Sequence, residues 1–237
     1  MQTLSIIIPV YNEERTVEDL YRQLIQVDFA SKQFVPEILF INDCSTDGTR
    51  PILDRLERDE HVRVLHQERN QGKGAALRRG FTEAKGSYIV VQDADLEYDP
   101  QDFLALLDPV VNHEADVVYG SRFTWSRERK ILNYWHYLGN AFLTRLSNLF
   151  SGWNLTDMET CYKLIRKKIL DQVHLKENRF GIEPELTAKL ARNKQLRVYE
   201  VPISYLGRGY DEGKKIGVRD GFRAIYCIVK YNLFKGT

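Results

Sequence analysis

Short apolar runs rich in β-branched residues alternate with amphipathic stretches through the first 120 residues, and this alternation constrains the fold more than any other feature. It is typical of βαβ units, in which helices connect parallel strands and cover the sheet. The apolar runs predict strands at 4–10, 37–41, 62–66, 88–92 and 116–119. The stretches between them predict helices near 14–27, 50–59, 73–84 and 101–112. The expected fold class is α/β, with a mostly parallel sheet between helices.

The size and charge of the chain limit its organisation and its partners. Its 237 residues are 43% hydrophobic and 28% charged, a balance typical of an ordered globular protein, and we expect one domain, 1–237. The second half is less regular and predicts strands at 162–166 and 197–205 and helices at 185–192 and 220–234. A formal net charge of +1 gives no overall basic field, so we expect no nucleic-acid partner.

Cysteine usage and the hydropathy pattern indicate a compartment. Cys44, Cys161 and Cys227 are far apart in the sequence and form no C-x-x-C pair, so we expect neither a disulfide framework nor a zinc site. The sequence shows no secretory signal, and no stretch reaches the ~20 apolar residues that span a bilayer. We therefore expect a cytoplasmic protein that does not cross a membrane, which leaves peripheral attachment to a membrane surface open.

Polar clusters follow four of the predicted strands, at 9–14, 42–48, 70–76 and 92–97. Ligands of open parallel sheets bind beyond the carboxyl ends of the strands, which makes such clusters the first candidates for a site. Asp93 and Asp95 follow a buried-strand run, and two carboxylates this close repel each other unless a cation joins them. Mg²⁺ or Mn²⁺ commonly bridges protein carboxylates to substrate phosphates. The alternative is an ordinary loop whose aspartates cap a helix.

The segment that begins Gly72-Lys73-Gly74 follows a predicted strand and opens a predicted helix, as a dinucleotide fingerprint does. However, Leu77 occupies the third glycine position. The first strand-to-helix turn also lacks glycine, although a dinucleotide fold carries its fingerprint there. We therefore reject a dehydrogenase and expect the glycines to bring the backbone close to a bound nucleotide, with a plain helix start as the alternative.

Taken in order, the four clusters resemble family 2 inverting glycosyltransferases of the GT-A fold. The resemblance is carried by I-I-I-P-V-Y-N-E-E, N-D-C-S-T-D-G-T, N-Q-G-K-G-A-A-L-R-R-G and D-A-D-L. It implies transfer of a sugar from a nucleotide sugar with Mg²⁺ or Mn²⁺ as cofactor. It also implies that the 1–120 half binds the nucleotide sugar and the 121–237 half binds the acceptor.

The resemblance also implies roles for single residues. The residues that it places around the donor nucleotide are Pro9, Tyr11, Glu13, Asp43, Gly72 and Lys73, with Asp43 hydrogen-bonded to the base. Asp93 and Asp95 would bind donor and metal, and Asp95 would be catalytic. Glu97 stands where related enzymes that act on lipid phosphates often have glutamine, so its carboxylate would be a third metal ligand.

The second half resembles the branch that glycosylates polyprenyl phosphate, through G-S-R-F at 120–123, T-D-M-E-T-C-Y-K at 156–163 and V-P-I at 201–203. This implies hexose transfer from a UDP- or GDP-sugar, with a slight preference for UDP, to a dolichyl- or undecaprenyl-type phosphate. Arg122 would bind the acceptor phosphate, with a structural ion pair as the alternative. Asp157 would act as a base for an alcohol acceptor, orient the cations of the acceptor site, or merely cap a helix.

Three further stretches are candidates for contact with lipid or substrate. Aromatic and basic residues are interleaved through 123–153, which resembles an interfacial element at a membrane surface, with a buried core helix as the alternative. The closing helix at 220–234 leaves the same two interpretations open. The loop at 208–215 carries Arg208, Lys214 and Lys215. The resemblance implies that it folds over the donor pyrophosphate and the acceptor phosphate, and a solvated surface loop is the alternative.

Two other functions compete with transfer to polyprenyl phosphate. One keeps the donor site but uses a hydroxyl of a saccharide or another acceptor in cell-surface polysaccharide synthesis. The other is a non-catalytic nucleotide-binding module, in which we would expect Asp93 or Asp95 to be replaced. Because both are present, we reject it.

Overall fold

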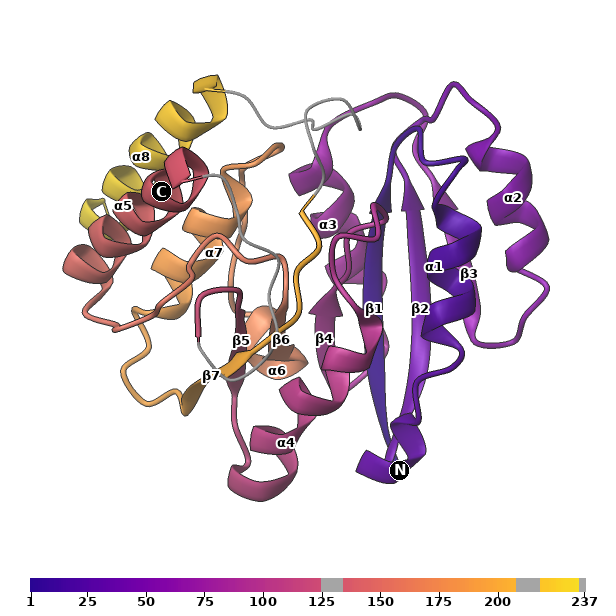
Figure 1. Ribbon diagram of the computed structural model, residues 1–237, viewed down its shortest axis with the longest axis horizontal. Coiled ribbons are helices and arrows are strands. Elements are labelled where there is room, and N and C mark those ends of the chain that lie inside the picture. The colour runs from indigo at the N-terminus through magenta and orange to yellow at the C-terminus, as the bar shows by residue number, and fades with distance from the viewer. Residues whose placement is uncertain (125–133, 208–217, 235–237) are drawn as a thin grey trace.

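A seven-stranded sheet crosses the centre of the computed structural model, which describes residues 1–124, 134–207 and 218–234 (Figure 1). In spatial order its strands are β3 (Val62–His66), β2 (Phe34–Asn42), β1 (Gln2–Val10), β4 (Tyr88–Val91), β6 (Lys163–Arg166), β5 (Val117–Ser121) and β7 (Val198–Pro202). All pairings are parallel except those of β6 with β4 and β5. The predicted α/β class is confirmed.

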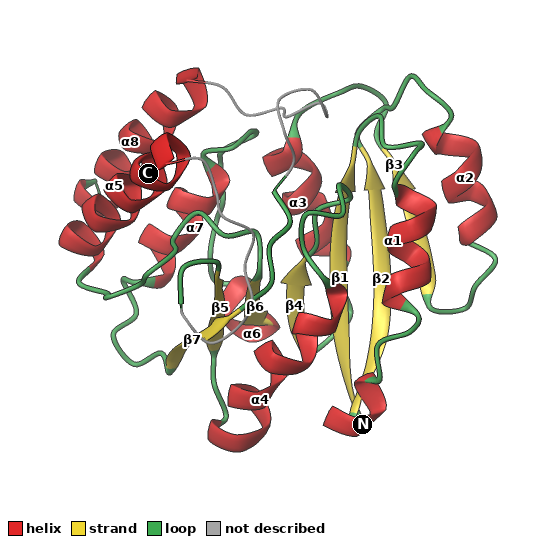
Figure 2. Ribbon diagram, viewed as in Figure 1, coloured by secondary structure: helices red, strands yellow, loops and turns green. Residues whose placement is uncertain are grey.

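Helices connect the strands of the first half: α1 (Val17–Leu24), α2 (Thr49–Leu56), α3 (Lys73–Glu83) and α4 (Phe103–His113), with the 3-10 helices η1 (Phe29–Lys32) and η2 (Pro100–Asp102). The second half adds α5 (Tyr134–Ser151), α6 (Lys167–Leu170), α7 (Ile182–Leu190) and α8 (Val218–Leu233). Helices α5, α7 and α8 pack on one another beyond the β5 and β7 end of the sheet (Figures 1 and 2).

The interior strands are apolar on both faces because helices cover the sheet on both sides. Leu4, Ile6, Ile7 and Ile8 of β1 are fully buried. Parallel register places Val10 opposite Asn42 and Ile7 opposite Val91, so β1, β2 and β4 end at the same edge of the sheet. The polar clusters that follow these strands therefore converge, as the sequence predicted.

Strand β6 is the main departure from a simple parallel sheet. The predicted strand at 162–166 forms, but it inserts antiparallel between β4 and β5. Its residues from Lys163 to Ile165 are buried, a pattern that both strand directions satisfy equally. Predicted boundaries also shift: α1 is shorter than 14–27, α7 begins at Ile182 rather than 185, and β7 ends at Pro202 rather than 205.

Residues 134–151 of the aromatic stretch form α5, which has two different faces, and residues 125–133 of that stretch lie outside the described residues. Thr144 and Ser147 are buried on one side. On the other, Trp135 is 74% exposed and Phe142 is 54% exposed. In α8, Phe222 is 71% exposed. Within the three described ranges, no helix combines the length and apolar character that crossing a bilayer requires.

We predict that the contact of α3 with β1 limits the size of residue 80. A Cβ on Gly80 would clash with Ile7 Cγ2, whereas a Cβ on Gly139 of α5 would meet no atom within 4 Å. Gly80→Ala and Gly139→Ala share the same gain in helix propensity, so their difference isolates the packing cost. The free energy of unfolding in urea should be lower for Gly80→Ala than for Gly139→Ala by roughly 1–3 kcal/mol. Equal free energies of unfolding for the two variants would contradict this packing.

Candidate active site

The loops after β1 and β2 are tied together by their own hydrogen bonds. Asn12 adopts a positive φ of 54°, and its side-chain Oδ1 accepts from the Thr46 amide at 2.8 Å. The Glu13 amide donates to Thr49 Oγ1 at 2.9 Å. Pro9 pairs with Ile41 in the sheet, and Tyr11 presents a ring that is 36% exposed. Pro9, Tyr11 and Glu13 thus lie at one edge, where their contacts with a nucleotide stay a prediction.

Asp43 organises the loop that leads to α3. Its carboxylate is almost fully buried and accepts from the Gln71 amide at 2.8 Å, from the Gly72 amide at 2.7 Å and from Gln67 Nε2 at 2.7 Å. Protein donors therefore occupy both oxygens of a side chain that was expected to bind the nucleotide base. Its hydrogen bond to a base stays a prediction, and the structure assigns it a positioning role.

The glycines at the start of α3 permit a close approach of backbone to backbone. Gly72 has a φ of +94°, and a Cβ there or on Gly74 would clash with backbone atoms of residues 177–179. The Ala75 amide donates to the Asn178 carbonyl at 3.1 Å. The glycines thus bring α3 against another segment of this chain, and an approach to a nucleotide stays a prediction.

Lys73 lies between two carboxylates at this edge. Its Nζ is 2.9 Å from Asp93 Oδ1, 3.0 Å from Asp93 Oδ2 and 3.1 Å from Glu183 Oε1. Burial opposes the charge of the ammonium, but Asp93 and Glu183 outweigh it and raise the pKa of Lys73 well above its ordinary value. Lys73 is therefore a permanent cation in contact with the first aspartate of the D-x-D pair.

Asp95 and Glu97 lie in the turn that follows. The Glu97 amide donates to Asp95 Oδ1 at 3.2 Å, and Leu96 between them has a φ of 60°. Glu97 Oε2 accepts from the Tyr205 hydroxyl at 2.8 Å. Burial, and then the charge of Glu97, raise the pKa of Tyr205, so its hydroxyl remains a donor. This turn is thereby joined to the chain just beyond β7.

Asp93, Asp95 and Glu97 are the candidate ligands of a divalent ion. Among the described residues, no group of three Asp, Glu, His or Cys side chains is placed to hold a metal. Asp93, Asp95 and Glu97 offer oxygen donors alone, the set that suits Mg²⁺ or Mn²⁺. Such ions often take one or two protein carboxylates and complete their shell with phosphates and water. The residues present fit an ion shared with a diphosphate.

Arg122 and Asp157 form a buried bidentate ion pair at the end of β5. Arg122 Nε donates to Asp157 Oδ2 at 2.6 Å, and Nη2 donates to Oδ1 at 2.8 Å. The carboxylate also accepts from the Arg122 amide at 3.1 Å and is fully buried. N–H groups of Arg122 thus engage both oxygens of the carboxylate. The geometry therefore favours Asp157 as an orienting group over Asp157 as a base.

Tyr205 connects the two parts of the site. The Arg122 guanidinium lies 5.1 Å from the centroid of its ring, and its hydroxyl donates to Glu97. The sequence prediction missed Tyr205, because it lay at the end of an expected strand, and Glu183, because the expected helix began after it. Two acids at 183 and 185 in an otherwise apolar stretch were the available signal for Glu183.

Arg208, Lys214 and Lys215 lie outside the described residues, so their role stays a prediction.

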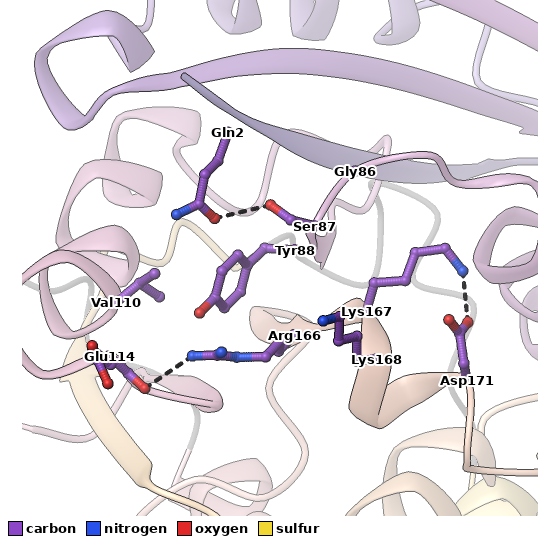
Figure 3. A pocket seen from close by; sticks show the side chains of 10 residues that line it. All are labelled: Gln2, Gly86, Ser87, Tyr88, Val110, Glu114, Arg166, Lys167, Lys168 and Asp171. Atoms are coloured by element: carbon purple, nitrogen blue, oxygen red, sulfur yellow. Dashed lines mark hydrogen bonds and ion pairs between the residues drawn. The ribbon is translucent and has the colours of Figure 1, made fainter.

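A cavity of about 540 Å³ lies at the opposite edge of the sheet, where Gln2 begins β1 and Tyr88 begins β4 (Figure 3). Two of its cations are paired: Lys167 Nζ is 2.6 Å from Asp171, and Arg166 Nε is 3.1 Å from Asp116.

Comparison with known proteins agrees with this geometry. Residues 5–173 match the model of the family described as Glycosyl transferase family 2. A dolichol-phosphate mannosyltransferase of Pyrococcus furiosus is 29% identical over 237 residues, which cover 96% of this chain but only 64% of that protein. A UDP-N-acetylglucosamine–dolichyl-phosphate N-acetylglucosaminyltransferase of Methanococcus voltae is 26% identical, with 98% of this chain and 97% of that protein covered.

A solved structure shows the same fold. Glucosyl-3-phosphoglycerate synthase from Mycobacterium tuberculosis, in complex with Mn²⁺, UDP and phosphoglyceric acid, matches with a TM-score of 0.70 over 98% of this chain and 79% of that chain. The sequence identity is 18%, so this likeness concerns the fold alone. Because the family model covers more than half of the sequence, the chain belongs to glycosyl transferase family 2.

Proposed function

We propose that this protein is an inverting glycosyltransferase that moves a hexose from a UDP- or GDP-sugar to a polyprenyl phosphate of dolichyl or undecaprenyl type. The 1–120 half would bind the donor and the 121–237 half the acceptor. One observation carries the proposal: a buried guanidinium, fixed by Asp157, shares an edge of the sheet with the acid pair Asp93 and Asp95. The names of the relatives, which act on dolichyl phosphate, support the same acceptor class.

The charges at this edge suit an anionic acceptor. A phosphate monoester is already largely ionised at neutral pH, because its second pKa lies near ~6, so it needs positioning rather than a general base. Arg122 has five N–H donors and gives two side-chain groups to Asp157, so the pair can bind an anion without separating. Asp157 would hold the guanidinium in place while the acceptor oxygen attacks the anomeric carbon in line.

The acid pair suits the departing group. Inversion by a single displacement leaves a nucleoside diphosphate on the side opposite the acceptor, near Asp93 and Asp95. A bound Mg²⁺ or Mn²⁺ would offset the negative charge of that diphosphate. Asp95 would supply the principal protein ligand, with Asp93 and Glu97 near it, and Lys73 would hold the Asp93 carboxylate in position.

We further propose peripheral attachment to the cytoplasmic face of a membrane. Exposed aromatic and apolar side chains of α5 and α8, including Trp135, Phe142 and Phe222, would sit at the level of the lipid headgroups. Polyprenyl phosphate would reach the site from that surface. All three cysteines are free, which suits a reducing compartment.

A direct assay tests the transfer. The full chain is incubated with Mn²⁺ and a panel of UDP- and GDP-sugars, with and without a short polyprenyl phosphate, and the lipid is analysed by mass spectrometry. We expect a glycosyl polyprenyl phosphate, and Asp95→Asn should lower its rate by about 100-fold or more. Asp99→Asn, in the exposed η2 cap nearby, should retain the activity. Transfer only to non-lipid hydroxyls would overturn the proposed acceptor.

Arg122→Lys tests the role of the guanidinium. Lysine keeps the charge but loses the two-point contact with Asp157. We expect kcat/KM for polyprenyl phosphate to fall by about 100-fold, with the KM for the nucleotide sugar nearly unchanged. Arg197→Lys is the matched control, because Arg197 pairs with Asp116 and Glu114 on the surface. An equal rise in the KM for polyprenyl phosphate and in the KM for the nucleotide sugar would instead indicate a general structural defect.

Exposed aromatic residues are expected to control membrane binding. The double variant Trp135→Ser, Phe222→Ser removes two rings that are more than 70% exposed. It should sediment markedly less with vesicles that contain polyprenyl phosphate, yet keep its kcat with a short soluble acceptor. Ile25→Ser removes an exposed apolar side chain at the end of α1 and should sediment like the wild type. Unchanged sedimentation of the double variant would contradict attachment through this face.

A further inference from the structure

The Lys73 ammonium already occupies the carboxylate that a divalent ion is expected to share. Both oxygens of Asp93 lie within 3.0 Å of Lys73 Nζ, and Glu183 Oε1 lies 3.1 Å away. The three side chains are 16%, 20% and 10% exposed, so water screens these charges only weakly. In this arrangement the positive charge of Lys73 offsets the negative charge of Asp93.

The backbones that carry Lys73 and Glu183 are joined to each other. From the middle of α3, Arg78 Nη1 donates to the Lys176 carbonyl at 2.6 Å and to the Glu177 carbonyl at 3.0 Å. The same segment is joined to α7, because the Lys176 amide donates to Glu185 Oε1 at 2.8 Å and the Glu177 amide to Glu185 Oε2 at 2.7 Å. The 176–177 segment therefore connects the backbones of α3, which carries Lys73, and α7, which carries Glu183.

Asp93 belongs to a different part of the site, since it follows β4 and begins the turn of Asp95 and Glu97. The hydrogen bonds that join the backbones of α3 and α7 do not involve that turn, so Asp93 can move on ligand binding while these two backbones stay together. Glu183 also has an acceptor to offer: its Oε2 is buried and, within the described part of the chain, makes no hydrogen bond. An unused buried acceptor is costly, and a closer approach of Lys73 would satisfy it.

We propose that Lys73 is a resident counter-cation of Asp93 that opposes divalent-ion binding to the free protein, and that Glu183 takes over the ammonium once a nucleoside diphosphate and the ion bind together. The inference deepens the proposed function and rests on it. An ammonium and a divalent ion on one carboxylate repel each other. The added negative charge of the diphosphate overcomes this repulsion, so the ion binds tightly only together with the nucleotide.

Titration calorimetry of Mn²⁺ into the full chain, first alone and then with UDP or GDP, tests the proposal. Wild type should bind Mn²⁺ weakly until the nucleotide is present. Lys73→Met should tighten binding of Mn²⁺ alone by about tenfold or more, because Asp93 loses its counter-cation. Glu183→Gln should weaken the binding of Mn²⁺, because Lys73 then has only Asp93 as a charged partner. It should also reduce the increase in Mn²⁺ affinity that UDP or GDP brings. Lys32→Met, which removes a lysine paired with Asp108 at 2.5 Å, should change nothing.

The opposite signs separate this proposal from a structural role, which would weaken Mn²⁺ binding in both variants. Weaker or unchanged binding in Lys73→Met overturns the proposal. Should that variant fail to fold, as judged by thermal unfolding, the double variant Lys73→Met, Glu183→Gln leaves no added net charge and must still bind Mn²⁺ more tightly than wild type. Sugar transfer does not enter these measurements. Lys73→Met and Glu183→Gln could shift the Mn²⁺ affinity in opposite directions while the transfer assay yields no glycosylated lipid. That result would support the role of Lys73 as counter-cation and refute the proposed acceptor.

Discussion

Parallel pairing of β1 with β2 and β4 brings several acidic side chains to one edge of the sheet, and the rest of the site depends on how their repulsion is relieved. Asp43, Asp93, Asp95 and Glu97 all follow strands that end there. Two neighbouring carboxylates in a partly buried place repel each other unless cations or hydrogen-bond donors compensate them. The structure supplies a different compensation for each acid, and each one has its own consequence for function.

Backbone amides compensate the charge of Asp43 and hold the loop before α3 against its carboxylate. An ammonium compensates Asp93, and because a lysine side chain is flexible, that charge can change partners. The guanidinium of Arg122 compensates the charge of Asp157 through two hydrogen bonds, which fix the guanidinium in one orientation. Directed hydrogen bonds thus hold the carboxylates of Asp43 and Asp157, whereas the ammonium of Lys73 is shared between two carboxylates.

Tyr205 and Glu183 show why the second half of the chain completes the site. Tyr205 lies just beyond β7, and its ring and hydroxyl connect Arg122 to Glu97. Glu183 comes from α7, whose preceding segment packs against the glycines of α3. Residues more than 100 positions apart therefore share one electrostatic network. The antiparallel insertion of β6 makes this possible, because it places β5 parallel to β4 and points Arg122 to the same edge.

The sequence by itself determined the α/β class, the strands β1 to β5 and the convergence of the polar clusters, because buried parallel strands need continuous apolar runs and their loops must follow them. It also indicated Asp93, Asp95, Arg122 and Asp157 as members of one site. Only the tertiary structure decided the direction of β6, the pairing of Lys73 with Asp93 and Glu183, and the contact of Gly72 with residues 177–179. The physical reason is that periodicity records which side chains are buried, whereas the partner of a buried charge depends on long-range packing that no local pattern encodes.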